Sequence, residues 1–155
     1  MQLSQDGLDF IKRREALFLK AYRDVAGIWT IGYGTIRING RAVQPGDTCT
    51  EEQAAQWIAD ECAVHEDALN RALANVTLAQ NQFDSLVSMS YNIGSAGILS
   101  STLVKTIQAG GTVIQDYFTR WSKARDPKTG QLVVVQGLLN RRMMEWQMYS
   151  IGVYA

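Results

Sequence analysis

The chain has 155 residues, of which 46% are hydrophobic and 19% are charged. This length and composition are typical of a globular protein with a sizeable core, and they exclude a mainly disordered chain. The 15 basic and 15 acidic residues cancel, so no net positive field favours nucleic-acid binding. No segment is apolar over the roughly 20 residues of a membrane span, and no stable membrane insertion is expected.

The first predicted element is a helix that begins after Ser4, a plausible N-cap. Leu8, Ile11 and Phe18 recur at helical spacing, and Glu15 falls on the same apolar face. An ionised carboxylate on a buried face is costly unless it is paired. Glu15 is therefore expected to keep a proton or to face a cation. A plain helix-surface ion pair, with a neighbouring lysine or a distant arginine, is the alternative interpretation.

A small β-meander is predicted for residues 21–44. Residues 28–34 alternate as a strand, with aromatic side chains on one face and Thr30 on a face that glycines leave nearly bare. A ligand or another backbone can approach such a face closely. Asn39-Gly40 is a strong signal for a hairpin turn. Asp24 lies at the start of the meander, in a loop that water is expected to reach.

Two carboxylates in different surroundings are what the hydrolysis of a glycosidic bond requires. A protonated acid at Glu15 could donate its proton to a leaving oxygen, and an ionised Asp24 could assist a water. A hydroxyl at Thr30 could hold that water by a further hydrogen bond. An Asx turn at Asp24 and strand propensity at Thr30 are the simpler alternatives for each residue alone. The ordered set of three favours the catalytic interpretation.

Helical patterns dominate after residue 50. Thr50 opens a capping box, and the helix that follows should run to about Leu73, long enough to join two lobes. In the last helix, Arg142 and Glu145 are expected on the polar side. The other predicted elements are a helix opened by a capping box at 77–80, helices from Ser100 or Ser101 to 110, over 112–124 and over 138–151, a turn at 126–130 and an extended piece at 132–135.

Cys49 and Cys62 are the only cysteines, and His65 is the only histidine. A disulfide is possible, but Cys62 lies on the apolar face of the long helix and is better explained as a reduced core thiol. His65 lies on the same face, where a hydrogen-bonded core histidine is favoured over a catalytic or metal-binding one. One histidine does not make a conventional metal site, and no metal or cofactor is expected.

The residues Glu15-Ala16, Asp24 and Thr30-Ile31-Gly32-Tyr33-Gly34 form the pattern E-A-x(7)-D-x(5)-T-I-G-Y-G. This pattern resembles the phage-type lysozymes, the endolysins of glycoside hydrolase family 24. The resemblance covers most of residues 4–150 and continues in Phe83 to Val87, Tyr91 to Gly94, Ser101 to Leu103, Trp121, Gly137 to Arg142 and Glu145.

The resemblance implies an α+β, mostly helical fold with two lobes. A small lobe with the β-meander, at about 12–50, would be joined by the long helix to a helical lobe at about 75–155, which also includes the N-terminal helix. Since no repeat, linker or composition change divides the chain, residues 1–155 are predicted to form a single catalytic domain.

The activity that the resemblance implies is hydrolysis of the β-1,4 bond between N-acetylmuramic acid and N-acetylglucosamine in peptidoglycan, with inversion at the anomeric carbon. Glu15 matches the general acid of the family. Asp24 matches the carboxylate that assists the attacking water, and Thr30 matches the hydroxyl that positions it. The alternatives are a lytic transglycosylase, which would need the acid but not Asp24, and an inactive glycan-binding protein of the same fold.

Further residues are expected around the substrate. Asn92 matches a position that lines the glycan cleft, and Trp29 and Tyr33 are the aromatic side chains expected near sugar rings, although packing of the meander is an equal alternative for both. Arg141 matches an arginine that pairs with the catalytic acid, with Arg142 as the alternative partner.

One residue departs from the family pattern, because Thr35 stands where many relatives have histidine after the second glycine. That histidine is regarded as structural, so activity is expected to survive the change.

Residues 1–10 have neither the basic nor the apolar character of a signal peptide. The protein is therefore expected in the host cytoplasm, with removal of an N-terminal export segment as the alternative, and a monomer is the default expectation. It would reach peptidoglycan in the periplasm after a phage holin permeabilises the membrane.

Overall fold

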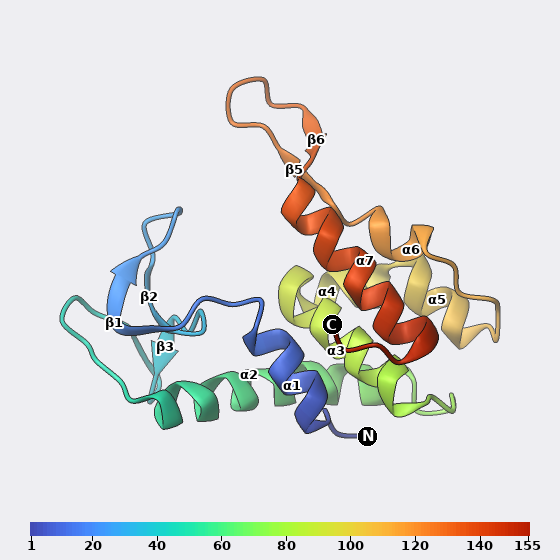
Figure 1. Cartoon of the computed structure of the whole chain (residues 1–155), viewed down its shortest axis with the longest axis horizontal. Helices are drawn as coiled ribbons and strands as arrows, with labels where there is room; N and C mark the ends of the chain where they lie inside the picture. The colour runs from blue at the N-terminus through green and yellow to red at the C-terminus, as the bar shows by residue number, and fades with distance from the viewer.

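A computed structural model describes residues 1–155 and shows a mostly helical α+β protein (Figure 1). The strands pair into three separate two-stranded antiparallel sheets. None of the helices combines the length and the apolar composition needed to cross a membrane. The elements in chain order are α1 (Gln5–Lys12), β1 (Phe18–Arg23), β2 (Trp29–Gly32), β3 (Arg37–Ile38), β4 (Arg41–Ala42), α2 (Glu51–Ala72), α3 (Gln80–Ile93), α4 (Ser95–Ser100), α5 (Thr102–Gln108), α6 (Asp116–Thr119), β5 (Lys123–Arg125), β6 (Leu132–Val134) and α7 (Gln136–Ile151).

The predicted two-lobe architecture is confirmed. Strands β1 to β4 form the small lobe. Helix α2 runs along the base of the molecule from this lobe to the large lobe, which the remaining helices form (Figure 1). The helix α3 lies at the centre of the large lobe and contacts α1, α2, α4 and α7. Both chain termini lie on this side of the molecule.

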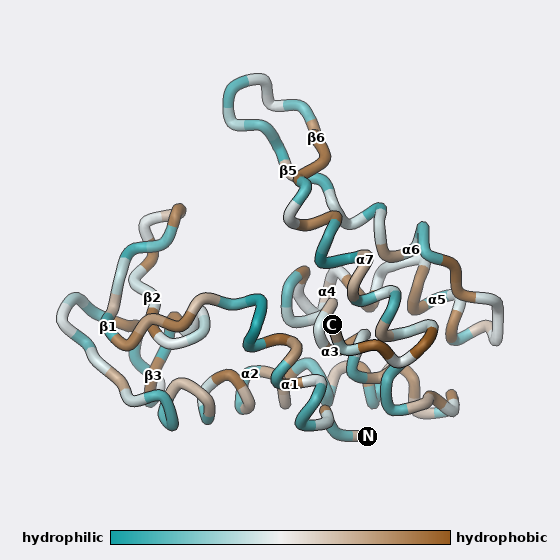
Figure 2. Tube along the Cα trace, in the orientation of Figure 1, coloured by the Kyte–Doolittle hydropathy of each residue, from teal (hydrophilic) through white to brown (hydrophobic).

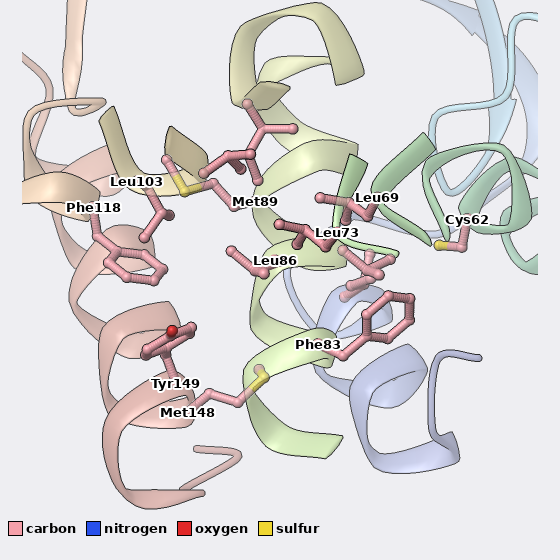
Figure 3. Close-up of a cluster of buried hydrophobic side chains, with 14 of the residues drawn as sticks. Cys62, Leu69, Leu73, Phe83, Leu86, Met89, Leu103, Phe118, Met148 and Tyr149 are labelled. Atoms are coloured by element: carbon pink, nitrogen blue, oxygen red, sulfur yellow. The ribbon is translucent and has the colours of Figure 1, made fainter. Parts of the chain in front are cut away.

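The core of the large lobe is a cluster of 17 buried side chains. Phe83, Leu86 and Met89 project from α3 into this cluster, where they lie among residues of α2 and α7 (Figure 3). Burying an apolar side chain of this size contributes about 1.5–3 kcal/mol to folding. The large lobe can thus hold α3 and α7 firmly, and both helices carry residues of the site described below.

The small lobe has its own, much smaller core of Ile31, Ile38 and Val43. Asn39 and Gly40 connect β3 and β4 with positive φ angles of 49° and 79°, as a type I′ hairpin turn requires. The predicted hairpin is therefore confirmed. Gly32 has φ +65°, and a Cβ there would lie 3.3 Å from the Cβ of Ala54, so the bare position lets the strand approach α2.

The prediction that the first helix extends through Phe18 was wrong. Helix α1 ends at Lys12, and the next residues lead into β1, where Phe18 pairs with Gly32 and Arg23 pairs with Trp29. The helical spacing of apolar residues is overridden here by long-range strand pairing, which a local pattern cannot detect. Glu15 therefore lies in the connection between α1 and β1, not on a helix face.

Two further boundaries differ from prediction. Only Asp116–Thr119 is helical in the segment 112–124, and its end, Lys123–Arg125, pairs instead with Leu132–Val134 as a hairpin. This hairpin projects from the large lobe, and its strand β6 is hydrophobic (Figure 2). Helix α3 begins only at Gln80, after Ala79, whose N–H donates to Gln82 Oε1 at 2.9 Å.

The capping box at the start of α2 is confirmed. Thr50 Oγ1 accepts from the N–H of Gln53, and Gln53 Oε1 accepts from the N–H of Thr50. Thr50→Ala should therefore lower the free energy of unfolding by about 1 kcal/mol in urea denaturation. Thr77→Ala is the matched control, since Thr77 is exposed and caps no helix. An equal loss in both variants would contradict the capping role.

The two cysteines are free, and Cys62 is buried in the core. Burial raises the pKa of the Cys62 thiol to about 12, so this group stays protonated at neutral pH. The interpretation of Cys62 as a reduced core thiol is confirmed.

Candidate active site

A cleft of about 530 Å³ contains the first of the predicted catalytic residues. Glu15 lines the cleft from the connection between α1 and β1, and Tyr33 lines it directly after β2. The opposite wall comes from α2 and α3, including Tyr91 and Asn92. A volume of this size is within the range of about 300–1,000 Å³ that small-ligand sites occupy.

Arg141 of α7 holds Glu15 in place. Its Nη1 donates to Glu15 Oε1 at 2.8 Å, and the Glu15 side chain keeps 25% of its surface exposed. Arg142, the other candidate partner, contacts Asn92 instead, where Nη2 donates to Oδ1 at 2.9 Å. Two residues that line the cleft are thus fixed by neighbouring arginines of one helix.

Both arginines meet at Glu145, one turn further along α7. Arg141 Nε lies 3.2 Å from Glu145 Oε1, and Arg142 Nε lies 2.8 Å from Oε2. Ser88 Oγ donates to Oε1 at 2.8 Å. Burial raises the pKa of Glu145, whereas the two guanidinium groups and the Ser88 hydroxyl favour its charged form. We name Glu145, Arg141 and Arg142 the buried ion cluster.

The expectation that Arg142 and Glu145 lie on the polar side of the last helix was wrong, because both are fully buried. Helical periodicity places charged residues in water by default. Here the opposite charges form ion pairs with one another inside the protein, between α3 and α7. Such an arrangement depends on tertiary contacts, which the pattern of a single helix does not contain.

Asp24 and Thr30 do not line the cleft. Asp24 Oδ1 accepts from the N–H groups of Ala26 and Ile28, at 2.9 and 2.8 Å, and closes the turn between β1 and β2. Thr30 is buried, and its Oγ1 donates to the carbonyl oxygen of Ile28 at 3.0 Å. The simpler roles, turn formation and strand packing, are therefore satisfied at both positions. No hydrogen bond or ion pair joins either residue to Glu15.

Of the two aromatic residues predicted near the sugar, only one lines the cleft. Tyr33 lines the cleft, with Lys12 Nζ 5.6 Å from the centre of its ring. Trp29 packs against the small core and lies outside the cleft. The guanidinium carbon of Arg23 lies 5.2 Å from the centre of the Trp29 ring.

Sequence reasoning missed a second acid in the cleft, Glu61 of α2. The Tyr91 hydroxyl lies 3.3 Å from Glu61 Oε2 and 3.2 Å from the carbonyl oxygen of Tyr33. The buried Thr35 hydroxyl also lies near this carboxylate, and it makes no hydrogen bond within the protein. Thr35, the departure from the family pattern, is thus a neighbour of Glu61. The sequence held one indication of this role. Glu61 lies one turn before His65 on α2, and both residues line the cleft.

His65 also borders the cleft, although the sequence predicted a core position. Its Nδ1 is 2.8 Å from Ser90 Oγ and 2.9 Å from Ser95 Oγ. Burial lowers the pKa of His65 and favours the neutral ring. His65 thus has the predicted hydrogen bonds, but it is half-buried at the cleft and does not lie in the core.

A mostly helical two-lobe fold with acidic side chains in its cleft defines a lysozyme-like protein. Residues 12–145 match the family model of phage lysozyme. The endolysin of Acyrthosiphon pisum secondary endosymbiont phage 1 is 37% identical, covering 97% of this chain and 99% of that protein. The chain belongs to the phage lysozyme family and is accordingly a lysozyme-type hydrolase.

Two further similarities agree. The endolysin of Bacillus phage PZA is 39% identical over 98% of this chain, which spans only 56% of that longer protein. The structure of the endolysin from Escherichia coli O157:H7 phage FAHEc1 superposes with a TM-score of 0.92 and 45% identity, covering 100% of this chain and 97% of the other.

Proposed function

We propose that this chain is a peptidoglycan muramidase that cleaves the β-1,4 bond between N-acetylmuramic acid and N-acetylglucosamine, with Glu15 as the general acid. The observation that carries the proposal is the position of Glu15 in the cleft, fixed by Arg141 at 2.8 Å. Arg141 also contacts Glu145, so its charge is shared between two carboxylates. A positioned acid next to a sugar-sized cleft is the minimum that glycosidic cleavage requires.

For the attacking water, we propose Asp24 as the assisting carboxylate and Thr30 as the hydroxyl that positions it, with inversion at the anomeric carbon. Both turn hydrogen bonds of Asp24 involve Oδ1, and Oδ2 remains available to a water. The Thr30 hydroxyl uses its proton on Ile28, so its lone pairs can still accept.

Substrate binding is assigned to Asn92, Tyr33 and Trp29. Arg142 occupies Oδ1 of Asn92, which leaves the amide Nδ2 to donate to a sugar. Tyr33 offers its ring at the cleft wall. Trp29 would take part only if the glycan extends past the cleft onto the small lobe.

Asp24→Asn should lower the rate of cell-wall lysis by at least about 100-fold, the usual contribution of a general base. The asparagine keeps the Oδ1 acceptor of the turn, so the fold of the β1–β2 connection should persist. Turbidity loss of a cell-wall suspension measures the effect, and circular dichroism checks the fold. Wild-type activity in Asp24→Asn would remove the water-assisting role.

One experiment separates the three candidate activities. Purified protein is mixed with Gram-negative cells whose outer membrane is permeabilised, and the sugar ends are identified by mass spectrometry. Ordinary reducing N-acetylmuramic acid ends are expected. 1,6-Anhydro ends would identify a lytic transglycosylase and exclude a role for Asp24. No cleavage would leave the glycan-binding alternative and direct attention to Thr35.

We further propose that the protein acts as a monomeric single domain over residues 1–155, without metal or cofactor, and that it is stored in the host cytoplasm until a holin opens the inner membrane. Peptidoglycan lies beyond that membrane, so access has to be provided. Relatives include a SAR-endolysin of Escherichia phage 933W, 36% identical over 104 residues. Expression without a holin should leave cells intact, and co-expression with one should lyse them.

A further inference from the structure

Glu61 lies between two hollows of the surface. One is the cleft with Glu15, of about 530 Å³. The other, of about 390 Å³, lies between the β3–β4 hairpin and α2 and is lined by Arg37, Asn39, Trp57 and other residues. Glu61 is the only side chain that lines both. A polymeric ligand that extends from Glu15 along α2 would have to pass over it.

No cation compensates the Glu61 carboxylate, because none of the ion pairs of the protein includes it. The charged groups around it are Glu15, Asp60 of its own helix and, across the second hollow, Arg37, with the neutral Tyr91, Cys62 and His65 nearby. Burial raises the pKa of Glu61 above its usual range, and Asp60 and Glu15 add to this effect. Ionisation of Glu61 therefore opposes folding at neutral pH, and no ion pair offsets this cost, which the Tyr91 and Thr35 hydroxyls reduce only in part.

We propose that Glu61 is a glycan-binding residue of this cleft, which accepts hydrogen bonds from the hydroxyl or acetamido N–H groups of the sugar chain as it passes from the Glu15 cleft into the hollow beside Trp57. This inference rests on the proposed muramidase function. Tyr91 holds the carboxylate from the protein side at 3.3 Å, and the Thr35 hydroxyl lies beside it. A carboxylate has about four acceptor positions, so capacity remains for the sugar.

The test compares Glu61→Ala and Glu61→Gln with the wild type, using solubilised uncross-linked glycan strands of alternating N-acetylglucosamine and N-acetylmuramic acid. Loss of a charged acceptor should raise KM about tenfold or more in Glu61→Ala, with a much smaller change in kcat. Asp67→Ala is the control, because Asp67 is exposed on the same helix and lines no hollow. An unchanged KM in Glu61→Ala would overturn the inference, as would a loss of kcat alone.

A pH series adds a second readout. Because the ionised carboxylate is the better acceptor, KM of the wild type should rise as the pH falls through the raised pKa of Glu61, and this dependence should vanish in Glu61→Gln. A dependence that persists unchanged in Glu61→Gln would contradict the inference.

Thermal unfolding distinguishes binding from a structural role. The folded state holds the Glu61 proton more tightly than the unfolded state does, so the wild type loses stability as the pH rises above the ordinary glutamate pKa. Glu61→Gln should therefore have the higher Tm at pH 7 and an equal Tm at low pH. A lower Tm at pH 7 would indicate a structural role and overturn the inference.

The two proposals fail in different ways. If the wild type does not cleave the strands, the muramidase function fails, and KM is not measurable. If the wild type cleaves them and Glu61→Ala has the same KM, only the role of Glu61 fails.

Discussion

Glu15→Gln should abolish lysis of peptidoglycan and leave the fold intact. The amide cannot donate the proton that the leaving oxygen needs, and general acid catalysis contributes about 10²–10⁴-fold to the rate. The amide oxygen of the glutamine can still accept the hydrogen bond that Arg141 Nη1 donates to Glu15 Oε1 at 2.8 Å. Turbidity loss and the release of reducing ends measure the activity, and circular dichroism with thermal unfolding measures the fold.

The control for this substitution is Glu51→Gln, which makes the same chemical change on an exposed residue in the first turn of α2. Its activity should match the wild type. Cleavage at more than about one-hundredth of the wild-type rate in Glu15→Gln would mean that another group donates the proton. Glu61 would then be the first candidate, because it is the other acid in the same cleft.

The parts of the fold that follow from local chemistry were predictable from the sequence. Thr50 and Gln53 satisfy each other's backbone N–H groups within four residues, and Asn39-Gly40 supplies the positive φ angles of a hairpin within two. Strand β1 was not predictable in this way. Phe18–Arg23 continues the helical spacing of α1, and its pairing with β2 depends on residues further along the chain.

The candidate site shows the same division. The order of Glu15, Asp24 and Thr30 in the sequence suggested a catalytic set, and of the three only Glu15 lines the cleft. The placement of Asp24 and Thr30 depends on how β1 and β2 pair and turn, which a local pattern does not contain. Glu61 was missed because a glutamate on a long, mixed helix resembles a solvent-facing residue. Only the approach of Tyr91 from α3 and of Thr35 from beyond β2 gives it a specific environment.

Glu145→Gln should destabilise the protein by about 3–5 kcal/mol, because removing one partner of a buried ion pair leaves the remaining charge uncompensated. The carboxylate is fully buried and contacts both Arg141 and Arg142. A domain of ordinary size has a total stability of about 5–15 kcal/mol. The variant should therefore unfold at a much lower urea concentration than the wild type. If it is partly unfolded at 25 °C, the measurement is made at low temperature.

The buried ion cluster also connects stability to the site, because its arginines are the same residues that hold Glu15 and Asn92. Asp9→Asn is the control, since the Asp9–Lys12 pair is a solvent-accessible contact of 3.8 Å, and breaking such a pair costs at most about 1 kcal/mol. If Glu145→Gln cost no more than Asp9→Asn, the two arginines would be stabilised by other groups. Glu145 would then not anchor the cleft, and Arg141 would have to hold Glu15 through that single contact.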